Sequence, residues 1–443
     1  MPCSSHKDHR AIAVDASFHP IGTLGRRANE REALSQVSRR LTKMQSKAGE
    51  AANHSGIAGV IFLSLLPSFL YALFRFSIGV ALPEIGGEFN LDSGQAGTLV
   101  SISLAAATAT TGLAGYLSDR LGEKRVITGG LFLYSAGLLG ILVSARYDLF
   151  LALVVLNGLG SGLMLTPTYS VIGRLVPRSR GIWTGALSGV YNIGGFVGPV
   201  LTSALLATFG WRTPFAIMGG AGIVVAVLAL FLLRVPPPNV RAKSSSATLS
   251  FNSSRLSFLR QRNIVIIGAA MFLADLAFLA LISWAPTFML NQLSMPPEQV
   301  GFFFGLAIAA GGLGVMSMGY LFDRIGGKRA TLLAAGMSAG LSFLFLVSPG
   351  GSWLGIAFLI FAGFAANSFW SLLSALAQVN VDQSQIGTAT GVIQNIGFVG
   401  AMIGPVIAGS LLSNSPISSA LIVTVSLPYL IYTLLVIFYK PPK

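Results

Sequence analysis

The sequence predicts an all-helical integral membrane protein with twelve transmembrane helices, arranged as two similar six-helix halves. The chain of 443 residues is 53% hydrophobic and only 10% charged, which leaves too few polar residues to cover a soluble protein of this size. Apolar runs of about 20 residues, the length that crosses a bilayer as a helix, recur twelve times. One charged motif occurs twice, 204 residues apart, and this spacing indicates an internal duplication.

The twelve apolar runs divide six and six around a basic, polar segment. Residues 1–56 form a basic tail that we expect in the cytoplasm, residues 57–234 and 263–439 form the two six-helix bundles, and residues 235–262 form a cytoplasmic linker. The linker contains three successive prolines and three successive serines, as is typical of a segment that lets two bundles move separately. The runs begin near residues 57, 93, 126, 149, 182, 214, 263, 299, 330, 352, 386 and 417.

The positions of Lys and Arg predict the orientation, because short cytoplasmic loops retain basic residues. With both termini in the cytoplasm, 26 of the 29 Lys and Arg residues fall on that side, and only Arg146 and Arg212 fall outside. This pattern explains the net charge of +14 without a nucleic acid partner, and it indicates a multi-pass protein of the plasma (inner) membrane with anionic lipids beside its basic loops. Acidic residues lean the other way, and the expected external loops hold Glu84, Glu88, Asp92, Asp148 and Glu298.

Nothing in the sequence indicates an enzyme, a cofactor or a metal site. The only cysteine is Cys3, so we expect no disulfide or thiolate cluster, and all four histidines lie in the tail. The motif G-x-x-x-x-G-K-[ST], which an ATP-driven pump would need, is absent. The tail segment from Arg26 to Lys47 has charges at helical spacing, and it is either a short amphipathic helix or a disordered basic tail that fixes orientation.

The duplicated motif connects two apolar runs in each half. The first copy reads GYLSDRLGEKR from Gly115 to Arg125, and the second reads GYLFDRIGGKR from Gly319 to Arg329. The duplication extends further, because Asn-Ile-Gly recurs in the fifth and eleventh runs and Pro83 corresponds to Pro286. The same two runs carry small residues that allow close helix packing and that end in Gly-Pro, namely Gly194, Gly198 and Pro199 in one and Gly400, Gly404 and Pro405 in the other.

From Ile57 to Tyr439 the chain resembles a twelve-helix member of the major facilitator superfamily, whose best-known signature is the duplicated turn. The Gly-Pro ladder resembles a second element, noted more often in helix 5 of antiporters of that family. The resemblance implies alternating access, in which two bundles rock about a central site. It also implies that Asp119 faces the N-terminus of helix 11 and that Asp323 faces the N-terminus of helix 5 when the cytoplasmic gate is closed. Alternatively, these charges only mark topology.

A carboxylate at a helix N-terminus is worth roughly 0.3 to 1 kcal/mol, so these contacts would bias the protein toward the outward-open state. We expect a monomer. The residues assigned to the cytoplasmic gate are Gly115, Asp119, Arg120, Gly122, Lys124, Arg125, Gly319, Asp323, Arg324, Gly326, Lys328 and Arg329.

Arg75 in helix 1 and Asp275 in helix 7 are the two charged residues predicted within the membrane, where ionisable groups are costly and usually functional. Counted from Pro83 and Pro286, their depths differ by three residues, so they can meet in a central cavity. In one mechanism Arg75 binds an anion and Asp275 carries a proton, which gives symport. In another, Asp275 exchanges a cation for protons, which gives efflux by antiport. In a third, the two residues form a permanent salt bridge without a transport role.

Further polar residues at helical spacing mark faces that can line the cavity, although each could simply bond a neighbouring helix. Helix 4 lacks the R-x-x-Q-G motif of many proton antiporters of the family, and this departure weakens the antiport interpretation. We therefore predict a secondary transporter that imports a small organic anion or polar metabolite with protons; a drug- or metabolite-exporting antiporter and a transporter-like sensor are the alternatives. The predicted substrate contacts are Arg75, Tyr169, Tyr191, Asn192, Asn367, Trp370, Gln394 and Asn395, with Asp275 for proton coupling.

Overall fold

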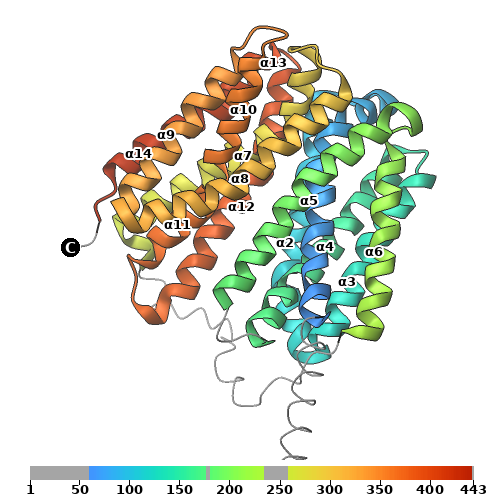
Figure 1. Cartoon of the computed structure of the whole chain (residues 1–443), viewed down its shortest axis with the longest axis horizontal. Helices are drawn as coiled ribbons and strands as arrows, with labels where there is room; N and C mark the ends of the chain where they lie inside the picture. Colours follow the sequence, from blue (N-terminus) through green and yellow to red (C-terminus); the bar gives the residue numbers. More distant parts are fainter. Residues whose placement is uncertain (1–58, 176–179, 234–257, 442–443) are drawn as a thin grey trace, which may run out of the picture. The chain divides into compact units, whose positions relative to one another are not determined.

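The computed structural model describes residues 59–175, 180–233 and 258–441 (Figure 1). The expectations for the N-terminal tail and for most of the linker concern residues outside these ranges. Within them, twelve helices are long and apolar enough to cross a membrane. They begin within three residues of the predicted positions, so the predicted number and order of spans are confirmed.

The first six spans form one group. They are the first helix (Gly59–Phe89), α2 (Ser93–Leu121), α3 (Glu123–Gly140, extended by the 3-10 turn η1, Ile141–Val143), α4 (Tyr147–Leu175), α5 (Arg180–Phe209) and α6 (Arg212–Leu232). Local sequence explains their ends. At the start of α2 the Asp92 side chain accepts a hydrogen bond from the Gln95 backbone at 2.8 Å, and the Gln95 side chain accepts one from the Asp92 backbone at 3.1 Å. This reciprocal cap satisfies two otherwise free N–H groups.

The last six spans form a second group. They are α7 (Arg262–Asn291), α8 (Pro297–Ile325), α9 (Gly327–Leu346), α10 (Trp353–Ala366) continued by α11 (Phe369–Gln378), α12 (Ile386–Leu412, preceded by the 3-10 turn η4, Gln383–Gln385), and α13 (Ile417–Leu421) continued by the π-helical turn η5 (Ile422–Ser426) and α14 (Leu427–Phe438). The tenth span is thus interrupted at residues 367–368, where a single continuous helix was expected.

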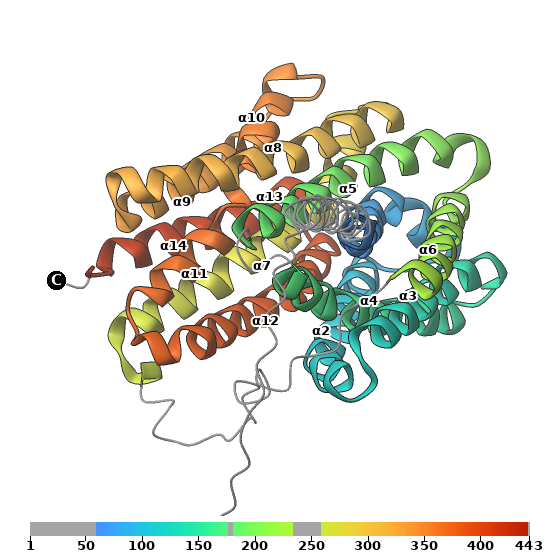
Figure 2. The same cartoon turned by 60° about the horizontal axis from the view of Figure 1, so that its bottom comes forward.

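The two groups contact each other through two pairs of the helices from α2 onward, and also where Gly79 of the first helix lies against Ile282 and Ser283 of α7. Within the first group α4 packs on α2 and α3, and within the second α7 packs on α12 and α14. Between the groups, α5 packs on α8 and α12 packs on α2, and the turned view of Figure 2 shows both pairs side by side. The glycines of the ladders in α5 and α12 pack inside their own groups: Gly194 and Gly198 lie against Phe69 and Leu73 of the first helix, and Gly400 and Gly404 lie against Phe272 and Leu276 of α7.

The inter-group contacts lie mainly toward one end of the helices. The motif turns, Gly115–Arg125 and Gly319–Arg329, lie at what we call the motif end. Toward the opposite end, Gly97 and Gly409 lie against the other group's backbone, at Pro405 and Ser93, and Gly301 lies against Ser203. Toward the motif end, no described atom lies within 4 Å of the position that a Cβ would take at Gly112, Gly115, Gly185, Gly189, Gly319, Gly387 or Gly391. The glycine contacts between the described groups therefore lie toward the opposite end, and no described glycine near the motif end packs against the other group, so the groups are less closely packed there.

One sequence expectation about the opposite end is wrong. Glu84 and Glu88 do not lie in a loop, because the first helix continues to Phe89 and includes both, and Asp148 and Glu298 lie in the first turns of α4 and α8. The loop after the first helix is shorter than predicted because an unbroken apolar run followed by Pro83 does not show where the last helical turns end.

Candidate functional site

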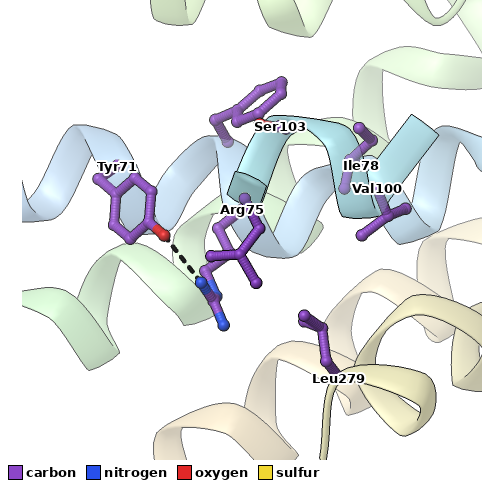
Figure 3. A pocket seen from close by; sticks show the side chains of 8 residues that line it. Tyr71, Arg75, Ile78, Val100, Ser103 and Leu279 are labelled. Carbon is purple, nitrogen blue, oxygen red and sulfur yellow. Dashed lines mark hydrogen bonds between the residues drawn. The ribbon is translucent and has the colours of Figure 1, made fainter. Parts of the chain in front are cut away.

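Arg75 lies in the first helix and lines a pocket between the two groups (Figure 3). The other lining residues are mostly apolar, and one of them, Leu279, comes from α7 of the second group. The cavity itself is small, about 20 Å³, which is room for about one water molecule, so a larger ligand requires the pocket to widen. The lining residues are Tyr71, Phe74, Arg75, Ile78, Val100, Ser103, Leu104 and Leu279.

The guanidinium of Arg75 has N–H donors that no described residue occupies. Its Nη1 donates a hydrogen bond to the Tyr71 hydroxyl at 2.7 Å, and the Tyr71 ring lies 5.8 Å from the guanidinium carbon. Its Nε is buried and has no partner among the described residues. Sequence reasoning missed Tyr71, although its position four residues before Arg75 puts both side chains on one helix face. The arrangement is a fixed cation beside apolar walls, with donors left for an anion.

Asp275 lies in α7 and is fully buried. Neither carboxylate oxygen has a hydrogen-bond partner among the described residues. Gly397 of α12 packs directly against the carboxylate, so closely that a Cβ at that position would collide with it. Trp370 of α11 is the neighbouring polar side chain, and it does not reach hydrogen-bond geometry. A buried ionised carboxylate without donors is very costly, so this environment favours the neutral acid.

Arg75 and Asp275 do not form a salt bridge, so this structure contradicts the permanent ion pair. The two residues are close enough for their charges to interact, but the Asp275 oxygens remain without any hydrogen-bond partner in the described part of the chain. The predicted similarity in depth is consistent with this placement. Similar depth does not determine how the two helices are rotated, so it does not predict whether the side chains pair.

The other predicted contact residues divide between the two groups. Tyr191 of α5 packs on the rings of Tyr71 and Phe76, with ring centroids 6.1 Å and 5.8 Å apart. Tyr169 of α4 is half exposed. In the second group, Trp370 packs on Phe398 at 5.2 Å.

The predicted amide residues make different contacts. Asn367 donates a hydrogen bond to Asn192 at 3.3 Å across the two groups. Gln394 donates to the Ser374 hydroxyl at 3.5 Å. Asn395 is exposed, and among the described residues it donates only to the Gly391 carbonyl of its own helix, at 2.8 Å.

The two motif turns have similar backbone angles, and their aspartates are exposed. Gly122 and Gly326 have φ angles of 85° and 89°, which side chains other than glycine rarely adopt. Asp119 and Asp323 are exposed and make no hydrogen bond or ion pair with any described residue. Lys328 donates to the Ile437 carbonyl at 2.7 Å. Since the two groups are less closely packed at this end, the structure does not test the predicted closed-gate contacts, and they remain predictions.

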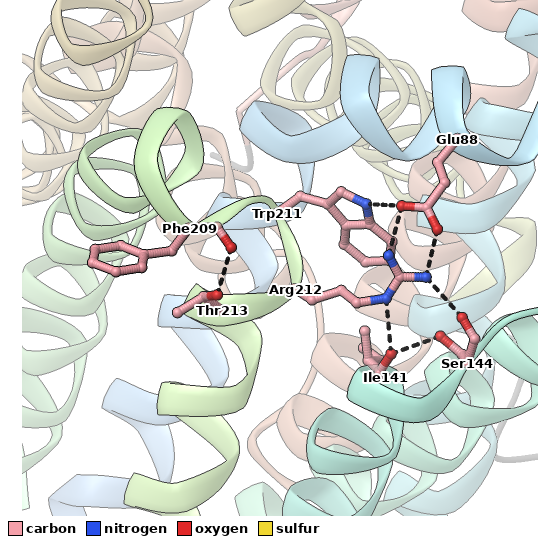
Figure 4. A network of polar contacts seen from close by, with 7 residues as sticks. All are labelled: Glu88, Ile141, Ser144, Phe209, Trp211, Arg212 and Thr213. Carbon is pink, nitrogen blue, oxygen red and sulfur yellow. Dashed lines mark hydrogen bonds and ion pairs between the residues drawn. The ribbon is translucent and has the colours of Figure 1, made fainter.

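A second polar cluster, which sequence reasoning missed, lies at the opposite end of the first group (Figure 4). Arg212 donates to both Glu88 carboxylate oxygens at 2.6 Å, to the Ser144 carbonyl at 2.7 Å and to the Ile141 carbonyl at 3.3 Å. Trp211 also donates to Glu88, at 2.8 Å. These bonds connect the first helix, the end of α3 and the start of α6. The donors and acceptors are matched, so we assign the cluster a structural role.

Comparison with known proteins agrees with this architecture. The family model described as Major Facilitator Superfamily matches residues 65–405. The 3-(3-hydroxy-phenyl)propionate transporter of Escherichia coli (strain K12) is 28% identical over 377 residues, which cover 82% of this chain and 89% of the relative. The 4-hydroxybenzoate transporter PcaK of Acinetobacter baylyi is 23% identical over 375 residues, covering 76% and 81%.

A solved structure shows the same fold. It is a bacterial homolog of the human lysosomal transporter Spinster in its inward-facing and unoccupied conformation, with a TM-score of 0.71, 17% identity, and coverage of 87% of this chain and 95% of that one. The family match spans most of the chain, and the twelve helices with their duplicated turns agree with it. The chain therefore belongs to the Major Facilitator Superfamily, and it is a membrane transporter rather than an enzyme.

Proposed function

We propose that this chain imports small aromatic carboxylates together with protons, and that Arg75 holds the carboxylate. The observation that carries the proposal is the Arg75 pocket. It combines one guanidinium, whose Nε has no partner among the described residues, with a Tyr71 hydroxyl and apolar walls. A guanidinium binds a carboxylate through parallel, charge-assisted hydrogen bonds. The apolar residues beside it suit a hydrocarbon ring better than a sugar.

The named relatives support the same class of substrate. Both 3-(3-hydroxyphenyl)propionate and 4-hydroxybenzoate, the compounds in their names, join a carboxylate to a phenol ring. A pocket for such a compound needs a cation at one end and apolar or aromatic side chains along the ring. Arg75 supplies the cation, and Phe74, Ile78 and Leu279 supply apolar surface.

We infer that the motif end faces the cytoplasm of a plasma membrane. The basic residues of the motif turns and the positive-inside rule support this orientation. The structure then represents the cytoplasm-open state, because the groups are less closely packed at the motif end. The exposed Asp119 and Asp323 fit this state, in which the predicted gate contacts would be broken.

Asp275 is the proposed proton carrier. In this state its carboxyl group is fully buried and receives no hydrogen bond from any described residue, and we propose that it holds a proton there. Ionisation would require either water entry or the approach of a cation such as Arg75. A substrate carboxylate that occupies Arg75 would compete for that charge, so substrate binding and protonation of Asp275 would support each other. This linkage is the basis of symport in the proposal.

Binding to purified protein tests the role of Arg75. The ligands are 4-hydroxybenzoate, 3-(3-hydroxyphenyl)propionate and the neutral amide of the first, and the readout is thermal stability. A ligand at 100 times its dissociation constant stabilises by about 2.7 kcal/mol. We expect both acids to stabilise the parent, the amide to have little effect, and Arg75→Gln to abolish the response. Arg75→Lys should weaken it, since a point charge replaces a bidentate donor.

The matched control for charge is Arg146→Gln, because Arg146 is highly exposed at the opposite end. Equal stabilisation by acid and amide, or an unchanged response in Arg75→Gln, would refute the assignment of Arg75. Stabilisation by cations alone would instead support the exporter.

Transport into proteoliposomes tests direction and coupling. An inward proton gradient should drive accumulation of the labelled acid, and Asp275→Asn should remove the effect of the gradient while binding persists. Accumulation driven by a gradient of the opposite sign would indicate antiport. Binding without any flux would indicate a sensor.

A further inference from the structure

Two asparagines from different groups meet near the middle of the helices. Asn192 is the thirteenth of the 30 residues of α5, and Asn367 lies at the interruption between α10 and α11. The Asn367 side chain donates to the Asn192 side-chain oxygen at 3.3 Å. Asn192 in turn donates to the Ser188 carbonyl of its own helix at 2.8 Å. Both ends of the Asn192 amide are therefore engaged, and one of them reaches across the two groups.

Two adjacent glycines of α8 provide the room for this pair. A Cβ at Gly311 would lie 2.9 Å from the Asn367 Cβ, and a Cβ at Gly312 would lie 2.9 Å from the Asn192 Cγ. Such distances are well inside ordinary van der Waals contact. Asn367 therefore packs directly against Gly311, and Asn192 packs directly against Gly312. Any larger residue at either glycine would push the two amides apart.

The interruption of the tenth span directs Asn367 toward the pair. The Asn367 backbone N–H bonds to the Gly363 carbonyl at 3.4 Å, while the Ser368 N–H bonds to the Ala365 carbonyl at 3.3 Å in a tighter turn. The Ser368 hydroxyl also bonds to Ala365. Helix α11 then restarts at Phe369 with its bonds intact. Irregular backbone is tolerated within a membrane only where other groups satisfy it, and here the N–H groups of Asn367 and Ser368 both have acceptors.

The pair lies at the boundary between the closely packed and the less closely packed parts of the interface. On the side of the opposite end, Gly305 of α8 packs on Phe196 of α5. On the side of the motif end, Met316 and Tyr320 of α8 are 74% and 60% exposed. Among the described residues, the amide pair therefore comes at the point where contact between α5 and α8 ends.

The duplicated half lacks this contact. Asn395 of α12 corresponds to Asn192, with the same Asn-Ile-Gly sequence and the same bond to a carbonyl four residues earlier. However, Asn395 has no cross-group hydrogen bond to a described residue. The positions of α2 that correspond to Gly311 and Gly312, at the motif's offset of 204, are Ala107 and Thr108. Asn395 is therefore an internal control for Asn192: it is the same side chain at the equivalent position of the other half, and it lacks the hydrogen bond between the groups.

We propose that the Asn192–Asn367 pair, seated on Gly311 and Gly312, is a polar latch between the two groups that favours the state open at the motif end. Rocking toward the state that is closed at the motif end would rotate α5 against α8 and the tenth span. This motion would lengthen the directional Asn367–Asn192 hydrogen bond beyond 3.3 Å. The latch is independent of the proposed substrate, because it acts in the empty transporter. It also assigns Asn192 and Asn367 a role other than direct contact with the transported solute.

Distances between spin labels in the substrate-free protein test the latch. The single cysteine, Cys3, is first replaced by Ser. One label pair, at Leu121 and Ile325, reports on the motif end, where these residues end α2 and α8. The other pair, at Val143 and Val347, reports on the opposite end. All four positions are at least 39% exposed, so labels can be attached there.

We expect Asn192→Ala and Asn367→Ala to increase the ratio of motif-closed to motif-open molecules by about 3-fold to about 18-fold, the range typical of interhelical hydrogen bonds in membranes. Asn395→Ala should leave the ratio unchanged. The double variant Asn192→Ala with Asn367→Ala should shift it no more than either single one, because both act through one bond. Gly312→Ala should shift it in the same direction by displacing Asn192.

Three results would overturn the latch: parental distances in Asn192→Ala, an equal shift in Asn395→Ala, or additive shifts in the double variant. If the residues only bind solute, the substrate-free distances would stay parental while affinity falls, and that also overturns it. Should Asn192→Ala fail to fold, Asn367→Ser keeps a polar group but cannot span the gap, and the same ratio is expected to rise. None of these outcomes depends on whether Arg75 binds aromatic acids.

Discussion

Replacing Arg212 with Gln should destabilise the protein by about 2 to 3 kcal/mol, because this side chain connects three helices. The bidentate pair with Glu88 is discounted to about 1 kcal/mol, since the two side chains are 24% and 42% exposed. The bonds to the Ser144 and Ile141 carbonyls, at 2.7 Å and 3.3 Å, add about 0.5 to 1 kcal/mol each. For a protein of this size the thermal midpoint should fall by about 3 °C.

The matched control is Arg146→Gln. Arg146 also forms an ion pair, with Asp148 at 3.1 Å, but the two side chains are 82% and 80% exposed. Such a pair contributes little, so the midpoint should not move measurably. A double-variant cycle of Glu88→Gln and Arg212→Gln should give a coupling of about 1 kcal/mol. Equal effects of Arg146→Gln and Arg212→Gln on the thermal midpoint would refute the reasoning, because burial and bond number would then not determine the contribution.

Three further outcomes are expected. Gly122→Ala and Gly326→Ala place a side chain at φ angles of 85° and 89° and should each cost about 1 to 3 kcal/mol, and a midpoint within 1 °C of the parent (roughly 1 kcal/mol for a protein of this size) would contradict this. Tyr134→Phe removes a buried hydroxyl that donates at 2.6 Å to a carbonyl of the first helix and should cost about 1 kcal/mol; an unchanged midpoint would count against it. Gly397→Ala forces a Cβ against the Asp275 carboxylate, so proton-driven accumulation should be lost while binding of the acid persists, and unimpaired uptake would argue against a role for that contact.

The sequence was sufficient to predict the number, order and approximate ends of the helices. Apolar runs of bilayer length are a strong signal, and charged turns separate them clearly. The same signal failed at Glu84 and Glu88, because a helix can extend past its apolar part when the extra turns find partners. Glu88 finds two, in Trp211 and Arg212, and they are more than 120 residues away in sequence.

The candidate site was predictable only in part. Rarity of charge within the membrane identified Arg75 and Asp275, and hydropathy reveals nothing about how the two helices are rotated. Whether those residues pair, and that Asn367 reaches Asn192 over 175 residues, depends on that rotation and on the interruption of the tenth span. The sequence does not predict the interruption, because residues 367–368 include no proline or glycine. Tyr71, by contrast, could have been predicted as a site residue, because its spacing of four residues from Arg75 can be seen in the sequence.

The matching backbone of the two motif turns bears on the ancestry of the protein. Gly122 and Gly326 share not only φ but also ψ, at 143° and 147°. An angle pair that other residues avoid leaves little freedom for drift after a gene is doubled. The ionisable sites had no such restriction: at an offset of 203, Arg75 corresponds to Phe278 and Asp275 to Ala72. The two halves have thus kept the same turn geometry at Gly122 and Gly326. They differ in their ionisable residues, because Arg75 lies in the first half and Asp275 in the second.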